Sequence, residues 1–455
     1  MPEESVGGVE ERLPPGRHGL LAAQQVLVSN VWLDPLYIAG AGGLSAALAT
    51  NLLIATFLGA GLATLVQSTR LVRLPVVEGP SSAFDPLAIG YAKAGDLAAA
   101  STGLLIAAGL VLVAALTGGV ARLRRVLGGA VPAVVITLVG ISLASFTVQE
   151  FFGNPGTADF ASAPTLLLAG ATTAVVVVGS AAGPRFRAFC FLAALVTGDV
   201  LALPLGRLDF SPVAQEPWFR LPSPLPYGGL TFDLGITVTM VIVFLVAVVE
   251  ALGLYEATAD LTGAPLSSRQ AGRGVAGEAA GSAVSALAGG FGTTAYAQNL
   301  GVIRMTGVAS RAVVRTAAVV FLVLAFVPKL AAVLVATPAP VVGGLFLPAA
   351  ATVLMSGLHL VVRDRGRPER NLVAPLSILV GVGVPTMSGS FTGWPPLLAE
   401  LASSPLIVGA VVVVVLEVLV SLVPDALRRR RSARSPARPM DPAGMAPGES
   451  GADRP

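Results

Sequence analysis

Long apolar stretches alternate with short polar segments along the whole chain of 455 residues. An α-helix needs about 20 mostly apolar residues to cross the hydrocarbon core of a membrane. Fourteen stretches qualify when two short ones are counted. They lie near residues 19–41, 44–66, 74–93, 97–120, 129–148, 163–183, 188–206, 231–258, 274–291, 293–309, 311–335, 338–362, 371–390 and 403–424. The pattern predicts an all-α polytopic membrane protein with 14 transmembrane segments.

Arginines test this count, because cytoplasmic loops of membrane proteins carry an excess of positive charge. Here they collect before the first span and then in every second loop. They are Arg12, Arg17, Arg70, Arg73, Arg122, Arg124, Arg125, Arg185, Arg187, Arg269, Arg273, Arg311, Arg315, Arg363, Arg365, Arg367, Arg370 and Arg428 to Arg431. The alternation predicts a multi-pass protein of the cell (plasma) membrane with both termini cytoplasmic, and the polar N-terminus shows no signal peptide.

The amino-acid composition argues against several classes of function. Charged residues make up 12% of the chain, about half of the roughly 25% that is usual in soluble proteins. The net charge of +3 is too small to indicate a nucleic-acid partner. The only histidines are His18 and His359 and the only cysteine is Cys190, so we expect no disulfide, no metal site and no cofactor. Because no nucleophile and base pair stands out either, we do not expect an enzyme.

The two halves of the chain form a repeat. Seven spans precede the loop at 207–230 and seven follow it, so the halves must run through the membrane in opposite directions. In such inverted repeats, interrupted spans at matching positions point to the binding site near the midplane. The third span of each half is interrupted, at Pro75–Gly90 and at Gly292–Gly307. We predict a short extended piece feeding a half-helix in each, buried or lining a cavity.

Two acids occupy matching first spans, Asp34 in span 1 and Glu250 in span 8. An ionised side chain at this depth is costly and persists only for function or with a partner. Glu250 could accept ring N–H groups of a substrate and take up a coupling proton, or it could form a structural hydrogen bond between helices. Asp34 could be a second proton or cation site facing Glu250, or it could bond a half-helix amide.

Span 3 offers backbone N–H groups at Ser82 and Ala83, where the half-helix begins, and these could meet a substrate. Asp85 precedes a proline, which favours a helix N-cap. Glu78 is expected near the cytoplasmic entrance, paired with Arg73.

Span 10 carries Gln298, whose amide can pair with a donor and acceptor edge, next to Asn299, which either caps the following half-helix or contacts the substrate. Gly301 permits close backbone approach. Arg304 either pairs with a carboxylate or binds an anionic substrate.

These residues resemble the nucleobase-ascorbate transporter family, the nucleobase:cation symporters that include xanthine and uracil permeases. Its signature of Gln or Glu, Asn, any residue, Gly and a later Thr is met by Gln298, Asn299, Gly301 and Thr306. The span 8 pattern Glu250, Gly253 and Tyr255 also fits, as do Glu278 and the PAPVVGG run from Pro338. The chain departs from the family pattern at Gln24–Gln25, Leu254, Ser82, Asp34, Asp85 and Arg304.

The resemblance implies a core domain and a gate domain, with substrate bound between them by Glu250 and Gln298 and with Glu278 supporting the span 8 acid from behind. The implied division is a cytoplasmic tail at 1–18, core at 19–120 and 231–335, gate at 129–206 and 338–424, and a disordered cytoplasmic tail at 425–455. Relatives are usually homodimers in the lipid bilayer.

The leading hypothesis is therefore uptake of a nucleobase by symport with H⁺, or alternatively Na⁺, through elevator-type movement of the core against the gate. Gln298 favours a purine such as xanthine over uracil, since uracil carriers tend to have Glu there. One alternative is an anion carrier or channel of the sulfate-transporter type, which shares the plan of two seven-span halves. Another is a membrane scaffold or sensor without transport.

Overall fold

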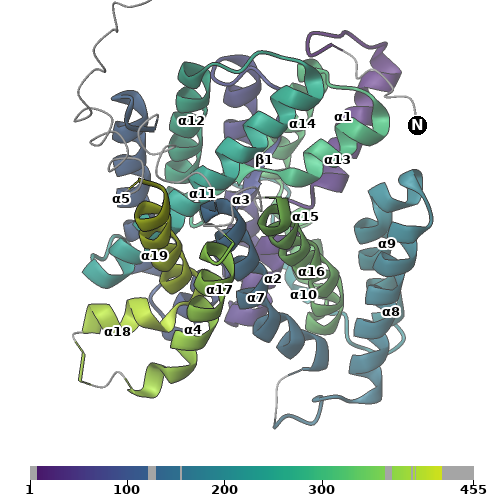
Figure 1. Ribbon diagram of the computed structural model, residues 1–455. Helices are drawn as coiled ribbons and strands as arrows, with labels where there is room; N and C mark the ends of the chain where they lie inside the picture. Colours follow the sequence, from purple (N-terminus) through teal and green to yellow (C-terminus); the bar gives the residue numbers. More distant parts are fainter. Residues whose placement is uncertain are drawn as a thin grey trace, which may run out of the picture.

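The computed structural model describes residues 8–120, 130–153, 156–363, 371–390, 393–394 and 396–422 (Figure 1). The first half contains α1 (Pro15–Ser29), α2 (Leu33–Gly42), α3 (Ala46–Thr69), β1 (Glu78–Pro80), α4 (Asp85–Ala94), α5 (Leu97–Leu116), α7 (Val131–Phe152), α8 (Ala163–Ala181), α9 (Pro184–Ala202) and, in the central loop, α10 (Ser211–Gln215). The second half contains α11 (Leu234–Thr262), α12 (Ser268–Leu287), β2 (Thr293–Ala295), α13 (Ala297–Thr306), α14 (Arg311–Leu324), α15 (Pro328–Val335), α16 (Ala339–Arg363), α17 (Val373–Gly383), a 3₁₀ turn (Val384–Ser390), α18 (Pro396–Ser403), α19 (Pro405–Glu417) and a π-helical turn (Val418–Leu422).

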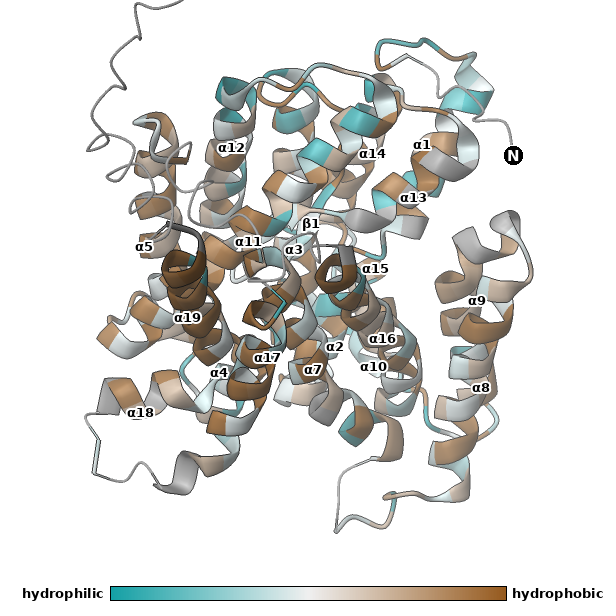
Figure 2. Ribbon diagram, viewed as in Figure 1, coloured by the Kyte–Doolittle hydropathy of each residue, from teal (hydrophilic) through white to brown (hydrophobic). Residues whose placement is uncertain are grey.

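Every predicted span contains at least one of these helices, and the protein is mostly helical. Among the described residues, six single helices are long and apolar enough to cross a membrane, and the bent pair α14–α15 makes a seventh candidate. Figure 2 shows apolar residues over the outer faces of α17 and α19 and hydrophilic ones near the ends of α12 and α14. Exposed apolar side chains such as Leu379, Val411 and Leu419 fit a surface that meets lipid.

Spans 3 and 10 are interrupted as predicted, with a strand before each half-helix, and two further spans are also broken. Span 1 breaks between α1 and α2 at Asn30, which takes the left-handed conformation with φ 55°. Asn tolerates this conformation better than most residues. Span 11 bends by 85° between α14 and α15, where Pro328 starts the second helix.

The two strands lie side by side in one small sheet, where Figure 1 labels β1; we call this strand pair and the residues beside it the strand crossing. They pair antiparallel with Glu78 opposite Ala295 and Pro80 opposite Thr293. Beyond the strands, the Ser81 N–H donates to the Gly292 carbonyl and the Tyr296 N–H to the Val77 carbonyl, both at 2.9 Å. The pairing satisfies backbone groups that water cannot reach at this depth.

A glycine in or next to each strand leaves space for an aromatic ring from the other interrupted span. A Cβ added at Gly79 would lie 2.5 Å from the Tyr296 ring, and one added at Gly292 would lie 2.4 Å from the Phe84 ring. Both distances are shorter than any ordinary carbon contact, so only glycine fits at either position.

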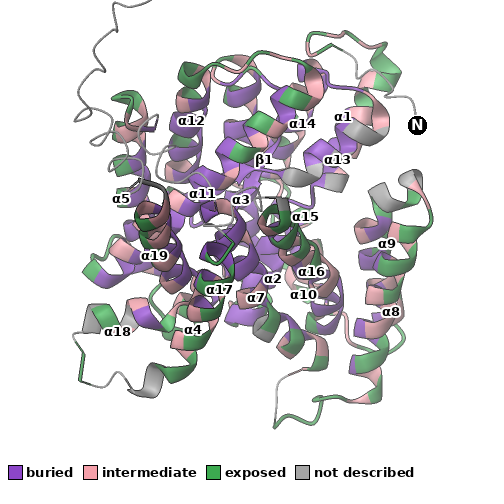
Figure 3. Cartoon of the chain, viewed as in Figure 1, coloured by how far each residue is buried: buried purple, intermediate pink, exposed green. Residues whose placement is uncertain are grey.

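Helices pack around this crossing in two sets. In the first set, α12 packs on α3, α5 and α11, α11 also packs on α5, and α14 packs on α3; α3, α11 and α12 also contact the strands. α7, α8, α16, α17 and α19 form the second set, joined to the first mainly through α2, α4 and α11. Figure 3 shows buried residues concentrated around the crossing, while α8 and α9 lie at the edge with much exposed surface.

The described part of the N-terminal tail is bound to the start of α14. Arg311 forms a 2.6 Å ion pair with Glu10, its backbone N–H donates to the Val9 carbonyl, and the Ser310 hydroxyl donates to the Glu11 carbonyl. The tail predicted at 425–455 lies outside the described residues.

Candidate functional site

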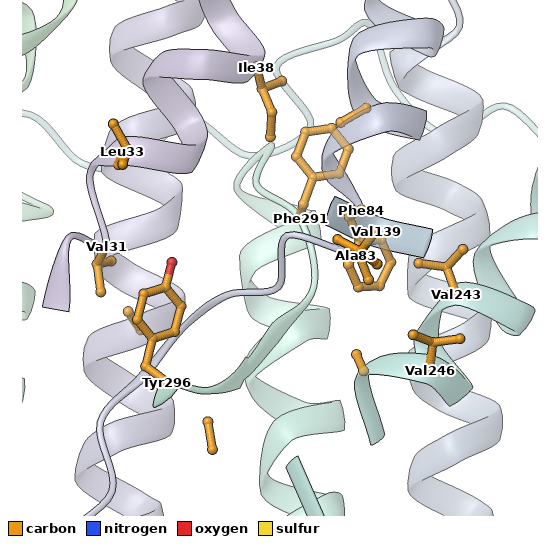
Figure 4. Close-up of a cluster of buried hydrophobic side chains, with 14 of the residues drawn as sticks. Val31, Leu33, Ile38, Ala83, Phe84, Val139, Val243, Val246, Phe291 and Tyr296 are labelled. Carbon is orange, nitrogen blue, oxygen red and sulfur yellow. The ribbon is translucent and has the colours of Figure 1, made fainter. Parts of the chain in front are cut away.

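The crossing brings polar groups from four separate elements together. Asp34 comes from the first turn of α2, Ser81 and Ser82 from the turn between β1 and α4, Glu250 from α11, and Tyr296 from the position before α13. Apolar side chains surround them, including Val31, Leu33, Ala83, Phe84, Val243 and Val246 (Figure 4). The site is thus a small polar centre inside an apolar core.

Glu250 is partly buried and accepts a hydrogen bond from the Ser81 hydroxyl at 3.1 Å. The same hydroxyl receives the backbone N–H of Ala83 at 3.4 Å. Ser81 therefore links the acid of α11 to the start of the first half-helix. Sequence reasoning missed Ser81, because two adjacent serines in a turn do not reveal which one faces α11.

Asp34 is 5% exposed, and its Oδ2 accepts hydrogen bonds from the Tyr296 hydroxyl at 2.9 Å and the Ser82 hydroxyl at 3.2 Å. Its described partners are side-chain hydroxyls, so they do not support the alternative in which Asp34 bonds a half-helix amide. Asp34 interacts electrostatically with Glu250, as expected for two acids that face the same centre. Tyr296 was also missed; its signal was a single tyrosine between the extended piece and the half-helix.

Asp85 does not cap its helix, so that prediction was wrong. Phe84 is the N-cap and has helical backbone angles, which places Asp85 inside the first turn. A capping side chain needs the extended backbone of the residue before the helix. Asp85 is 1% exposed, and neither of its carboxylate oxygens has a hydrogen-bond partner among the described residues, although its charge interacts with Asp34 and Glu250.

Asn299 does not cap its helix either. It is the third residue of α13, and its side-chain N–H donates to Gln25 Oε1 at 2.7 Å. The contact ties the second half-helix to α1. The Thr306 hydroxyl donates to the Val302 carbonyl at 2.8 Å and stays within the end of α13. The side chains of Gln298 and Arg304, and the packing around Gly301, lie outside the described residues, although their backbone is helical.

Glu78 lies in the strand crossing with 0% exposure, so the prediction of an entrance residue paired with Arg73 was wrong. Glu278 lies behind the crossing on α12, and its Oε1 accepts the Tyr255 hydroxyl at 2.5 Å. Tyr255 and Glu250 both belong to α11, and the charge of Glu278 interacts with that of Glu250. The described structure gives no hydrogen bond between Glu278 and Glu250, so the supporting role of Glu278 stays a prediction.

The centre accepts hydrogen bonds far more than it donates them. Among the described residues, no ion pair reaches Asp34 or Glu250. Within the same part of the chain, no set of three or more Asp, Glu, His or Cys side chains is placed to hold a metal ion. An arrangement of this kind suits a ligand that brings N–H groups.

Residues 18–389 match the model of the Permease family. The chain is 30% identical over 407 residues to the uric acid permease PucK of Bacillus subtilis, covering 87% of this chain and 94% of the relative. It is 27% identical over 422 residues to the xanthine permease of Bacillus subtilis, covering 91% and 96%. Its fold is similar to the transmembrane domain of the cyanobacterium bicarbonate transporter BicA, with a TM-score of 0.61 and 16% identity over 90% of this chain and 99% of that one.

Proposed function

The chain belongs to the nucleobase-ascorbate transporter family of membrane permeases, and we propose that it takes up a purine nucleobase by proton symport. Relatives that match nearly their whole length carry the names uric acid permease and xanthine permease, which supports an oxidised purine as substrate. The family makes the protein a transporter of small molecules and not an enzyme.

The pair of acids at the strand crossing, Glu250 and Asp34, is the main structural support for this proposal. Glu250 and Asp34 come from different halves, interact with each other, and have hydroxyl partners but no described ion-pair partner. A purine base presents ring N–H donors beside carbonyl acceptors. The carboxylates suit the N–H groups, and the backbone N–H groups of Ser82 and Ala83 and the Gln298 amide suit the carbonyls.

The same acids suit proton coupling. A carboxylate inside a membrane is costly when charged, so binding a proton and a neutral base together lowers the cost of moving the site. Glu250 is the first candidate for this proton and Asp34 the second. Glu278, Asp85, Gly301 and Thr306 would then support the site rather than contact the substrate.

We also propose that the two packed helix sets act as core and gate. The set with α3, α5, α11, α12 and α14 contains the strands and the acids, and the set with α7, α8, α16, α17 and α19 would be the static partner. Substrate would move with the core, in an elevator-type motion, within a homodimer in the cell membrane. Both termini would be cytoplasmic, so reporter fusions at Gly206 and after residue 424 should report opposite sides of the membrane. Matching signals would contradict the fourteen-span plan.

Uptake into proteoliposomes tests the main proposal. The panel contains xanthine, hypoxanthine, urate, uracil, ascorbate, sulfate and bicarbonate, each with and without H⁺ and Na⁺ gradients. We expect uptake of one or more purines, driven by an inward H⁺ gradient. Uptake of sulfate or bicarbonate alone would favour the anion carrier that the fold also permits. Movement of no solute would favour a scaffold or sensor.

A further inference from the structure

Behind the strand crossing, a group of buried acceptor atoms has no donor. Glu78 has 0% and Glu278 1% exposure. Neither oxygen of Glu78 has a hydrogen-bond partner in the described structure, and neither does Oε2 of Glu278. Gln67 Oε1 beside them also lacks one. A buried polar group without a partner carries a large desolvation cost, and a buried carboxylate an even larger one.

The side-chain donors described beside this group, Gln67 and Tyr255, already donate elsewhere or to Oε1 of Glu278. The Tyr255 hydroxyl gives its only proton to Glu278 Oε1 at 2.5 Å, although it also faces Glu78. The Gln67 side-chain N–H groups donate to the Tyr255 oxygen at 2.7 Å and to the Gly274 carbonyl at 2.8 Å. Because a carbonyl can only accept, these bonds fix which end of the Gln67 amide is the nitrogen. Glu78 uses its backbone N–H on Thr64 Oγ1 at 2.8 Å.

Both carboxyl groups lie beside the Tyr255 hydroxyl. Glu78 stands opposite Ala295 in the strand pair, and the Ala295 N–H faces the Glu278 carboxylate. The charges of Glu78 and Glu278 act on each other, and Tyr255 experiences both. Glu250 on α11 is the other acid that acts on them. Two carboxyl groups buried around one hydroxyl cannot both be ionised at low cost, and one shared proton resolves the repulsion.

We propose that Glu78 and Glu278 share one proton, and that this pair is a second proton-binding site, separate from the substrate-facing acids Asp34 and Glu250. The proton comes from water and binds Glu78, whose new O–H donates to Oε2 of Glu278. Glu278 keeps the negative charge, stabilised by the Tyr255 hydroxyl. One added proton thus gives Oε2 of Glu278 a donor, and the pair carries one negative charge instead of two.

The side chains around this proton are Gln67 on α3, Glu78 on β1, Tyr255 on α11 and Glu278 on α12. All four elements belong to the helix set that contacts the strands. The bound proton therefore stays with the crossing when the two helix sets move against each other. This inference does not depend on which substrate is carried, and it is tested without any substrate.

The test is infrared spectroscopy of the purified full-length protein at neutral pH, which detects the C=O stretch of protonated carboxyl groups. Glu78→Gln and Glu278→Gln should each remove one such band, because the new amide N–H can donate to the remaining carboxylate and replace the proton. The double variant should remove no more than either single variant. Two bands lost in the double variant would mean two independent acids, and no band lost would mean that no proton is held; either overturns the proposal.

Glu417→Gln is the matched control. Glu417 is also a buried glutamate, but its Oε1 already accepts the Ala130 N–H at 2.8 Å, so this variant should leave the band in place.

If the Gln variants at the pair do not fold, Tyr255→Phe is the alternative. It removes the donor to Glu278 and should shift the band of the pair, and an unshifted band would overturn the proposal. The spectra are recorded with and without Na⁺, and a band that disappears with Na⁺ would identify a metal-ion site instead.

Discussion

The two interrupted spans, β1–α4 and β2–α13, have the same backbone plan and different chemistry. Each joins a three-residue strand to a ten-residue helix, and each helix has an aromatic residue at its N-cap. The Phe84 ring packs on Gly292 of the second unit, and the Tyr296 ring packs on Gly79 of the first. The two units therefore brace each other in the same way from opposite sides.

Their polar groups differ. The Tyr296 hydroxyl donates to Asp34, whereas Phe84 has no polar atom and meets Phe244 edge-on with ring centroids 6.2 Å apart. The first unit supplies the serines that donate to Asp34 and Glu250, and the second supplies the Tyr296 hydroxyl and the Asn299 side chain, which donates to Gln25. An inverted repeat can thus keep its backbone while its two halves specialise. Two unlike halves suit a base whose edges are also unlike.

Replacement of Glu250 should have the largest effect on this division of roles. Glu250→Gln keeps the shape and can still accept from Ser81, but it removes the titratable group. We expect proton-driven accumulation of substrate to be lost, as measured by uptake into proteoliposomes under an inward H⁺ gradient. Asp34→Asn is the companion variant from the other half. Unchanged accumulation in Glu250→Gln together with loss in Asp34→Asn would move the coupling role to span 1.

The amide character of the second unit is tested by Gln298→Glu. A substrate carbonyl that received the amide N–H would face an oxygen instead, and a buried unpaired polar group costs about 1–3 kcal/mol. That corresponds to a loss of roughly five- to 150-fold in affinity for substrates with a carbonyl at that edge. Competition binding with purine and pyrimidine analogues measures the effect. Equal weakening for every analogue would show that Gln298 supports α13 and does not recognise the substrate.

The packing of the two units against each other is tested by adding one methyl group at Gly79 and one at Gly292. Gly79→Ala and Gly292→Ala place a carbon against the Tyr296 and Phe84 rings, and overpacking of this kind costs about 1–3 kcal/mol. We expect both variants to lower the thermal stability of the protein in detergent by similar amounts. Gly90→Ala, whose added Cβ would meet nothing within 4 Å, is the control. A loss confined to one of the two would show that the units do not brace each other equally.

Exchanging the hydroxyl between the units should have effects no larger than these, and Tyr296→Phe should have the smallest. Phe84→Tyr places a hydroxyl in apolar surroundings at a cost of about 1–3 kcal/mol if it stays unpaired. Tyr296→Phe removes one of two hydroxyl donors to Asp34 and should cost about 0.5–1.5 kcal/mol. Thermal unfolding compares the two variants on one scale. A larger loss for Tyr296→Phe would mean that Asp34 depends mainly on the second unit.

The sequence predicted the interrupted spans because glycine, proline and polar residues there cannot form a continuous apolar helix. It also predicted that Asp34 and Glu250 act in one place, because the repeat puts them at matching positions. It could not predict the environment of Glu78, since that depends on which residue of β2 lies opposite it. Ser81 and Tyr296 were missed for the same reason. Which hydroxyl groups reach the acids depends on the register of two strands that lie far apart in the sequence.

Pairing of β1 with β2 also limits how the protein can be made. β1 is synthesised long before β2, and until β2 is inserted the backbone groups of β1 have no partner strand in the membrane. The first half can therefore enter the bilayer before the second, but it cannot reach its final form alone. We expect the early chain to be held by the insertion machinery or to keep β1 near water until the second half arrives. Premature termination between the two strands should then leave a product that quality-control proteases remove.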